Sequence, residues 1–110
     1  MKRLLFLLLA APLFCVAQNT IGFPEVTNFS KSTYKGGLQN WDIKQALNGI
    51  IYFANNEGLL SFDGVFWNLY PLPNKTNVRS IETGADNHIY AGGQDELGYF
   101  APAGNGRLQY

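Results

Sequence analysis

The chain has 110 residues, of which 46% are hydrophobic and 15% aromatic, and its eight basic and eight acidic side chains cancel. Such a composition is typical of an ordinary globular protein. No cluster of Lys or Arg follows Arg3, so the sequence lacks the positive footprint of a protein that binds a phosphate backbone or an anionic membrane. These features argue against direct nucleic-acid binding.

Residues 1–17 have the three-part layout of a secretory signal peptide. Lys2 and Arg3 precede an apolar run, and Ala17 supplies a small residue at the end of that run. The run is shorter than the roughly 20 residues that span a bilayer, so an uncleaved anchor is the weaker interpretation. We expect cleavage after Ala17, export to the periplasm, and a mature N-terminus at Gln18.

Cys15 is the single cysteine of the chain. A lipoprotein box would keep and acylate this residue, but the bulky Phe14 stands where such a box requires a small side chain. If the signal peptide is removed, the mature chain has no cysteine, which excludes disulfides and Cys-ligated metal sites. The stability of the mature chain must then come from packing.

Four short strands joined by tight turns are predicted between Trp41 and Tyr70. Asn48-Gly49 and Asp63-Gly64 are two-residue hairpin sequences, and the polar residues 55–58 form another turn. Pro71 follows and ends the hydrogen-bonded pairing of strands, because proline has no amide hydrogen to donate. The expected strands are residues 41–47, 50–54, 59–62 and 65–70.

A second unit repeats the first at a distance of 38 residues. The shift places Asn48-Gly49 on Asp86-Asn87, so one turn falls on another. It also superposes five identical apolar or aromatic pairs: Ile43 and Ile81, Ile51 and Ile89, Tyr52 and Tyr90, Leu59 and Leu97, and Phe62 and Phe100. A period near 40 with four strands per copy is typical of a β-propeller blade. The expected fold is therefore all-β, with the first two four-stranded blades of a propeller at residues 41–74 and 75–110, the second with an incomplete outer strand.

Two blades do not make a complete propeller. Each blade has two apolar faces that neighbouring blades must cover, and a ring typically needs four to eight blades. We therefore expect the chain to be the N-terminal part of a longer protein, and we expect residues 18–110 alone to self-associate. Residues 18–40 form a leader, either a strand that closes the ring against the last blade or a flexible segment.

Two residues are candidates for ligand contact. Arg79 opens the innermost strand of the second predicted blade, where side chains approach the central axis. Trp41 could stack on a sugar, although large aromatic residues at alternating strand positions more often pack between blades. Trp67 is assigned to such packing.

No catalytic or metal-binding constellation is visible in the sequence. His88 is the only histidine and is expected in a surface turn. Asp95 and Glu96 are adjacent on a strand end, so their side chains point to opposite sides and do not form the facing carboxylates of a glycosidase. Gly92-Gly93 lacks the helix or Lys-Ser/Thr run of a phosphate loop. We expect no metal site, no cofactor and no enzymatic activity.

The chain from Phe23 to Tyr110 resembles the opening blades of the two-component-regulator propeller proteins of Bacteroidetes-type bacteria. Within that family it is most similar to the branch that carries a triple-tyrosine-motif domain after the propeller. The most specific matching pieces are Gln39-Asn40-Trp41-Asp42, Tyr52-Phe53-Ala54-Asn55-Asn56, Phe62-Asp63-Gly64 and Val78-Arg79-Ser80-Ile81.

This resemblance implies a periplasmic sensor, with a large propeller, a β-sandwich bearing three tyrosines, one transmembrane helix and a cytoplasmic output. The output is a histidine kinase or a helix-turn-helix DNA-binding domain, and neither lies in these 110 residues. The implied partners are a small molecule or glycan fragment, the remaining blades and a second subunit, in a full-length protein anchored in the inner membrane. Two alternatives stay open: a secreted propeller that binds carbohydrate or acts as a scaffold, and a propeller enzyme such as a lyase.

Overall fold

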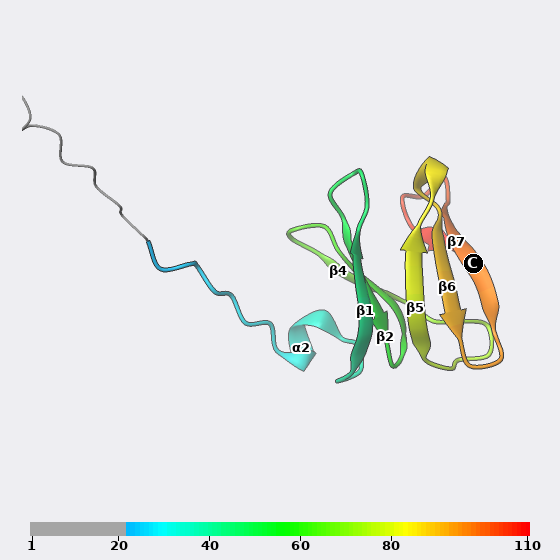
Figure 1. The fold of residues 1–110 in the computed structure, drawn as a ribbon, viewed down its shortest axis with the longest axis horizontal. Helices are drawn as coiled ribbons and strands as arrows, with labels where there is room; N and C mark the ends of the chain where they lie inside the picture. Colours follow the sequence, from blue (N-terminus) through cyan, green and yellow to red (C-terminus); the bar gives the residue numbers. More distant parts are fainter. Residues whose placement is uncertain (1–21) are drawn as a thin grey trace, which may run out of the picture.

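The structure is a computed structural model and describes residues 22–110. The predicted signal peptide, residues 1–17, and its cleavage point lie outside the described residues. The described part is mostly β, in two antiparallel sheets of four strands (Figure 1). Sheet 1 consists of β1 (Asn40–Gln45), β2 (Ile51–Asn55), β3 (Gly58–Phe62) and β4 (Trp67–Tyr70). Sheet 2 consists of β5 (Val78–Thr83), β6 (Ile89–Gly93), β7 (Leu97–Pro102) and β8 (Leu108–Gln109). The all-β prediction is confirmed.

Each sheet is a meander in which strands that follow one another in the chain pair side by side. The turn between β1 and β2 and the 3₁₀ helix η2 (Ala85–Asn87) between β5 and β6 occupy the same place in the two sheets. Asn48-Gly49 and Asp86-Asn87, which the repeat superposes, therefore lie in equivalent connections between the first two strands of their sheets.

Two predicted strands are too long. Residues 41–47 were expected to form a strand, but β1 ends at Gln45, because the amide of Gly49 donates to the carbonyl of Ala46 and closes a turn there. Residues 65–70 were also expected to form a strand, but β4 begins at Trp67. Asp63 Oδ1 accepts hydrogen bonds from the amides of Val65 and Phe66 at 2.8 and 2.7 Å, which keeps both residues in the turn.

Residues 22–39 of the leader form no strand in this structure. Between residues 22 and 39, its one regular element is the single helical turn α2 (Lys31–Tyr34), which ends at Lys35 in the left-handed region. The ring-closing strand stays a prediction, since its proposed partner belongs to a blade outside this chain.

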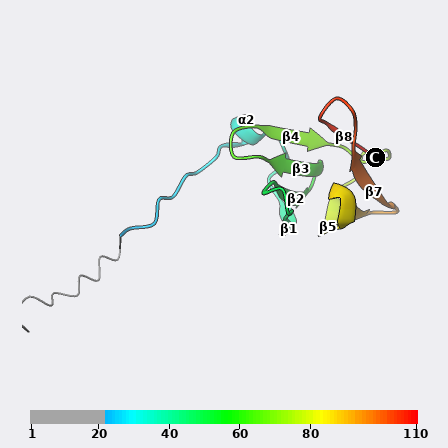
Figure 2. The ribbon, with the colours of Figure 1, turned by 90° about the horizontal axis from the view of Figure 1, so that it is seen from above.

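The two sheets pack on each other with their first strands side by side. Strand β5 lies against β1 and β2, and β1 and β5 lie at the same end of their sheets (Figure 2). One apolar core fills the space between the sheets. It consists of Ala46, Tyr52, Ala54, Leu59, Tyr70, Leu72, Val78, Ile81, Ile89, Ala91 and Phe100.

Residues that are equivalent in the repeat differ in burial. Tyr52 and Leu59 are 3% and 0% exposed, because sheet 2 covers them, whereas their equivalents Tyr90 and Leu97 are 48% and 84% exposed. The opposite faces show the reverse, since Ile81 of sheet 2 is 4% exposed and its equivalent Ile43 of sheet 1 is 58% exposed. Each sheet therefore has one covered face and one open face.

The leader covers the outer part of the open face of sheet 1. Phe29 and Tyr34 lie 5.2 and 5.9 Å from the ring of Trp67, which also stacks on Phe62 at 4.4 Å. The prediction that Trp67 serves packing is thus confirmed, although its neighbours come from the leader and sheet 1 rather than from the next sheet.

Candidate functional site

Both candidate ligand-binding residues lie in β-bulges. In β1, Asn40 and Asp42 face consecutive residues of β2, which leaves Trp41 as the extra residue. In β5, Val78 and Ser80 face consecutive residues of β6, which leaves Arg79 as the extra residue. Bulges interrupt the ladder and redirect a side chain, and they are over-represented near functional sites. The repeat places both bulges at the same position.

The structure brings Trp41 and Arg79 together. The guanidinium carbon of Arg79 lies 5.3 Å from the centre of the Trp41 ring, which is the geometry of a cation–π contact. Arg79 Nε donates to Asn77 Oδ1 at 3.3 Å, and Trp41 Nε1 donates to Asn56 Oδ1 at 3.2 Å. Trp41 is 49% exposed, so part of its aromatic surface is accessible to a ligand.

Two further contacts hold β1 beside β5. Asp42 Oδ2 accepts a hydrogen bond from the Ile81 amide at 3.1 Å, and Lys44 Nζ lies 3.2 Å from Glu82 Oε2. The Lys44–Glu82 pair is substantially exposed, so its contribution to stability is about 0–1 kcal/mol. Together with the Asp42–Ile81 hydrogen bond it links β1 to β5.

Together these side chains form a row that we call the inner-strand row: Trp41, Asp42, Lys44, Arg79 and Glu82. An exposed indole offers a stacking surface for a sugar ring or another flat ligand. A guanidinium offers paired donors to a carboxylate or to vicinal hydroxyls. The row is therefore suited to binding a polar ligand by stacking and hydrogen bonding.

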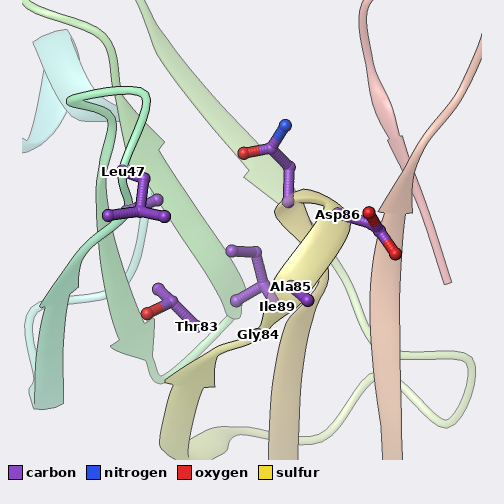
Figure 3. A pocket seen from close by; sticks show the side chains of 8 residues that line it. Leu47, Thr83, Gly84, Ala85, Asp86 and Ile89 are labelled. Atoms are coloured by element: carbon purple, nitrogen blue, oxygen red, sulfur yellow. The ribbon is translucent and has the colours of Figure 1, made fainter.

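A pocket of about 310 Å³ opens between the connections at the other end of the inner strands. Figure 3 shows Leu47 on one side of the pocket and Ala85 and Asp86 on the other. Asp86 is the one ionisable residue among those that line it. A single carboxylate beside backbone and aliphatic groups supplies neither a stacking surface nor a proton-transfer pair, so this pocket is a weaker candidate than the inner-strand row.

The other residues singled out in the sequence have structural surroundings. His88 stacks on Tyr99 with ring centres 4.9 Å apart. Glu96 accepts a hydrogen bond from the Tyr110 hydroxyl at 2.9 Å. Loss of hydration raises the pKa of Tyr110, and the hydrogen bond to Glu96 and its negative charge raise it further. Over residues 22–110, His, Cys, Asp and Glu side chains form no group of three or more that could hold a metal ion.

The glycine pair Gly92-Gly93 allows a close approach of backbone and side chains. A Cβ on Gly93 would lie 2.5 Å from Leu72 Cδ1 and 2.6 Å from the carbonyl oxygen of Asn77. A Cβ on Gly92 would lie 2.7 Å from Ser80 Oγ. All three distances are shorter than normal contacts. The segment before β5 requires glycine at position 93, because the Asn77 carbonyl belongs to the backbone, whereas the Ser80 hydroxyl beside Gly92 can rotate.

Asn55 is a structural residue that sequence reasoning assigned only to a turn. Its side chain is completely buried, and its oxygen accepts hydrogen bonds from the amides of Gly37 and Glu57 at 2.7 and 3.0 Å. Its nitrogen donates to the Gly37 carbonyl and to Asn40 Oδ1 at 2.9 and 2.8 Å. The two bonds to Gly37 fasten the leader to sheet 1, and the other two lie within sheet 1 and its β2–β3 turn. The Gly36-Gly37 pair was a usable signal, since glycine permits such a close approach.

No family model matches the chain, and neither a curated protein nor a solved structure matches it. Among residues 22–110, no helix combines the length and apolar character needed to cross a membrane.

Proposed function

We propose that the two sheets are the first two blades of a periplasmic, ligand-sensing β-propeller that belongs to a two-component-type signal transduction protein. The ligand is a small molecule or a glycan fragment. The observation that carries the proposal is the repeated bulge, which brings Trp41 and Arg79 into contact on adjacent inner strands.

Three features support the interpretation of the sheets as blades. Each sheet is a four-stranded antiparallel meander, the two are related by a 38-residue repeat, and they pack with their first strands side by side. Radial repetition of such sheets is the architecture of a propeller. The inner-strand row would then line the central axis, where successive blades can contribute side chains to one ligand.

The proposed role is binding and transmission rather than catalysis. A ligand shifts a receptor between two states only through different affinities for those states. A ligand that bridges Trp41 and Arg79 would favour the arrangement of adjacent blades in which the two side chains are close. In the complete sensor, that preference would pass to the domain that follows the propeller.

Ligand binding is tested by titrating the chain with a panel of neutral and uronic-acid oligosaccharides in a calorimeter. For any oligosaccharide that binds, we expect Arg79→Ala to weaken the affinity about tenfold, the equivalent of roughly 1.4 kcal/mol. Arg107→Ala is the matched control, because Arg107 also lies over an aromatic ring, that of Tyr70 at 5.7 Å, but outside the inner strands. Equal affinities of the two variants would contradict the proposed site.

A secreted carbohydrate-binding or scaffold propeller would use the same site, so binding alone does not separate it from a sensor. The coding sequence after Tyr110 does. A sensor requires an apolar run of about 20 residues followed by a cytoplasmic domain, whereas a secreted binder requires only the remaining blades.

A further inference from the structure

A second pocket, of about 240 Å³, opens between the outer strands of the two sheets. Strands β2, β3 and β4 with their turns supply one wall, and the β7–β8 hairpin supplies most of the opposite wall. No residue of the inner-strand row lines this pocket. Both walls belong to the residues that the structure describes, so the pocket needs no further blade to be complete.

A buried hydroxyl without a partner lines the wall that sheet 1 supplies. Tyr52, Ser61 and Asn68 are cross-strand neighbours on β2, β3 and β4, and all three line the pocket. Ser61 is 6% exposed, and among residues 22–110 its hydroxyl has no hydrogen-bond partner. Leaving a buried polar group unpaired is unfavourable. The Ser61 hydroxyl therefore marks a place where a polar atom of a ligand can bind.

Two opposite charges line the same pocket, one from each sheet. Asp63 lies in the β3–β4 turn and Arg107 in the β7–β8 turn, and both side chains are exposed. Within the part of the chain that the structure describes, neither forms an ion pair. Asp63 Oδ1 accepts the two backbone amides of its own turn, which leaves Oδ2 for a ligand. The guanidinium of Arg107 lies over the ring of Tyr70 at 5.7 Å, which holds it beside the pocket.

We propose that this pocket binds a small apolar amino acid in its free, zwitterionic form. The Asp63 carboxylate would accept hydrogen bonds from the ammonium group, and the Arg107 guanidinium would donate paired hydrogen bonds to the carboxylate. The aliphatic side chain of the ligand would lie against Ile50 and Leu108, which also line the pocket. Pockets for drug-sized ligands measure roughly 300–1,000 Å³, so the smaller volume here suits an amino acid.

The pair of charges argues against simpler ligands. An anion would bring its charge near the Asp63 carboxylate, and a cation would bring its charge near the Arg107 guanidinium, so each would meet one like charge. A ligand that carries both charges satisfies both side chains. The inference does not rest on the proposed sensory function, since it requires only the contact between the two sheets.

The test titrates the chain with L-leucine, L-valine and L-alanine in a calorimeter. We expect saturable binding of at least one of them. Each amino acid is compared with the amine that lacks its carboxylate and the acid that lacks its ammonium group, which for L-leucine are isopentylamine and isocaproate. Both analogues should bind at least about tenfold more weakly, because each loses the charge-assisted hydrogen bonds of one end.

Two substitutions of exposed residues locate the site. Arg107→Ala and Asp63→Asn should each weaken binding of the amino acid about tenfold or more, and Asp63→Asn keeps an acceptor for the amides of its turn. Asp95→Asn is the matched control, because Asp95 is an exposed carboxylate in the β6–β7 turn, at the other end of sheet 2 and outside the pocket. This control should bind like the wild type.

Three results would each overturn the proposal: no binding of any of the three amino acids, equal binding of the amine or the acid, or unchanged affinity in Arg107→Ala or Asp63→Asn. Such a failure would leave the inner-strand row untouched. That site is tested separately with oligosaccharides and Arg79→Ala, and neutral and uronic-acid oligosaccharides carry no ammonium group for Asp63.

Discussion

The covered face of sheet 1 and the open face of sheet 2 are built from the same repeat positions. Tyr52 and Leu59 are buried on the first, while Tyr90 and Leu97 are exposed on the second. The residues are identical in type and lie in equivalent strands. The difference shows that the repeat determines which residues form the strands, whereas burial depends on whether a neighbouring sheet is present.

The same comparison explains where the stability of this chain resides. Burial of a leucine side chain contributes about 1.5–3 kcal/mol, and Leu59 gains this contribution at the contact between the sheets whereas its equivalent Leu97 does not. The exposed residues on the open face of sheet 2 add little to the folding of the isolated chain, although they are as apolar as their buried equivalents in sheet 1.

The largest expected effect comes from replacing leucine with alanine at two equivalent positions of the repeat, 59 and 97. Leu59→Ala should lower the free energy of unfolding by about 2–5 kcal/mol, because it leaves a cavity between packed sheets. Leu97→Ala should change it by about 0.5 kcal/mol or less, since its side chain is mostly exposed. Urea unfolding followed by tryptophan fluorescence, at a protein concentration low enough to exclude self-association, measures both. Similar losses of unfolding free energy in the two variants would contradict the difference in burial between Leu59 and Leu97.

The second prediction concerns the end of sheet 1 that holds the leader. Asn55 fastens the leader there, whereas its equivalent in sheet 2 is Gly93, which packs against Leu72. Asn55→Ala should cost about 1–3 kcal/mol, because it leaves buried backbone groups of Gly37 without partners. The exposed neighbour Asn56, which accepts one hydrogen bond from Trp41, provides the control.

Hydrogen exchange at the Gly37 amide measures the local effect of the same two substitutions, Asn55→Ala and Asn56→Ala. In Asn55→Ala, the Gly37 amide should exchange faster than in the wild type, while in Asn56→Ala it should keep its protection. Unchanged protection of Gly37 in Asn55→Ala would mean that other contacts hold the leader in place.

The smallest expected effect concerns the acid sensitivity of the β3–β4 turn of sheet 1. Hydrogen bonds from the amides of Phe66 and Val65 lower the pKa of Asp63, and the equivalent position in sheet 2 is Ala101. Because the folded pKa lies below the unfolded one, this stabilisation is fully present above the unfolded pKa. It is lost as pH falls through the folded pKa.

A carboxyl titration followed by NMR should therefore place the midpoint of Asp63 below the usual range for aspartate. Asp63→Asn keeps an acceptor for both amides but does not titrate, so its stability should fall less between neutral and acidic pH than that of the wild type. If the stability of the two proteins fell equally between neutral and acidic pH, Asp63 would not be the source of the acid sensitivity of this turn.

Much of the fold could be predicted from the sequence because strand signals are local. Alternation, the Asp-Gly turn and the 38-residue repeat gave the number of strands in each sheet and their order. The errors lie at the strand ends, as at Val65 and Phe66, which have strong strand preferences but donate their amides to the Asp63 side chain. A side chain that competes for backbone donors is hard to anticipate from propensity alone.

The candidate site could be predicted only in part. Arg79 and Trp41 were each selected singly, and their equivalence in the repeat was available in the sequence. Their contact was not, because it depends on two bulges and on the packing of β5 against β1. The role of Asn55 was also hidden, since its partner Gly37 becomes a neighbour only once the leader folds back onto sheet 1.

The central claim is that the two sheets stack in sequence with their equivalent faces turned the same way. An NMR measurement of nuclear Overhauser effects between the rings of Tyr70 and Phe100 tests it most directly, since these rings belong to different sheets and their centres lie 6.2 Å apart. Cross-peaks between the two rings are expected in the wild-type chain and should keep their relative intensity on dilution, because the contact lies within one molecule. Assigned resonances without such cross-peaks would contradict the stacking of the sheets.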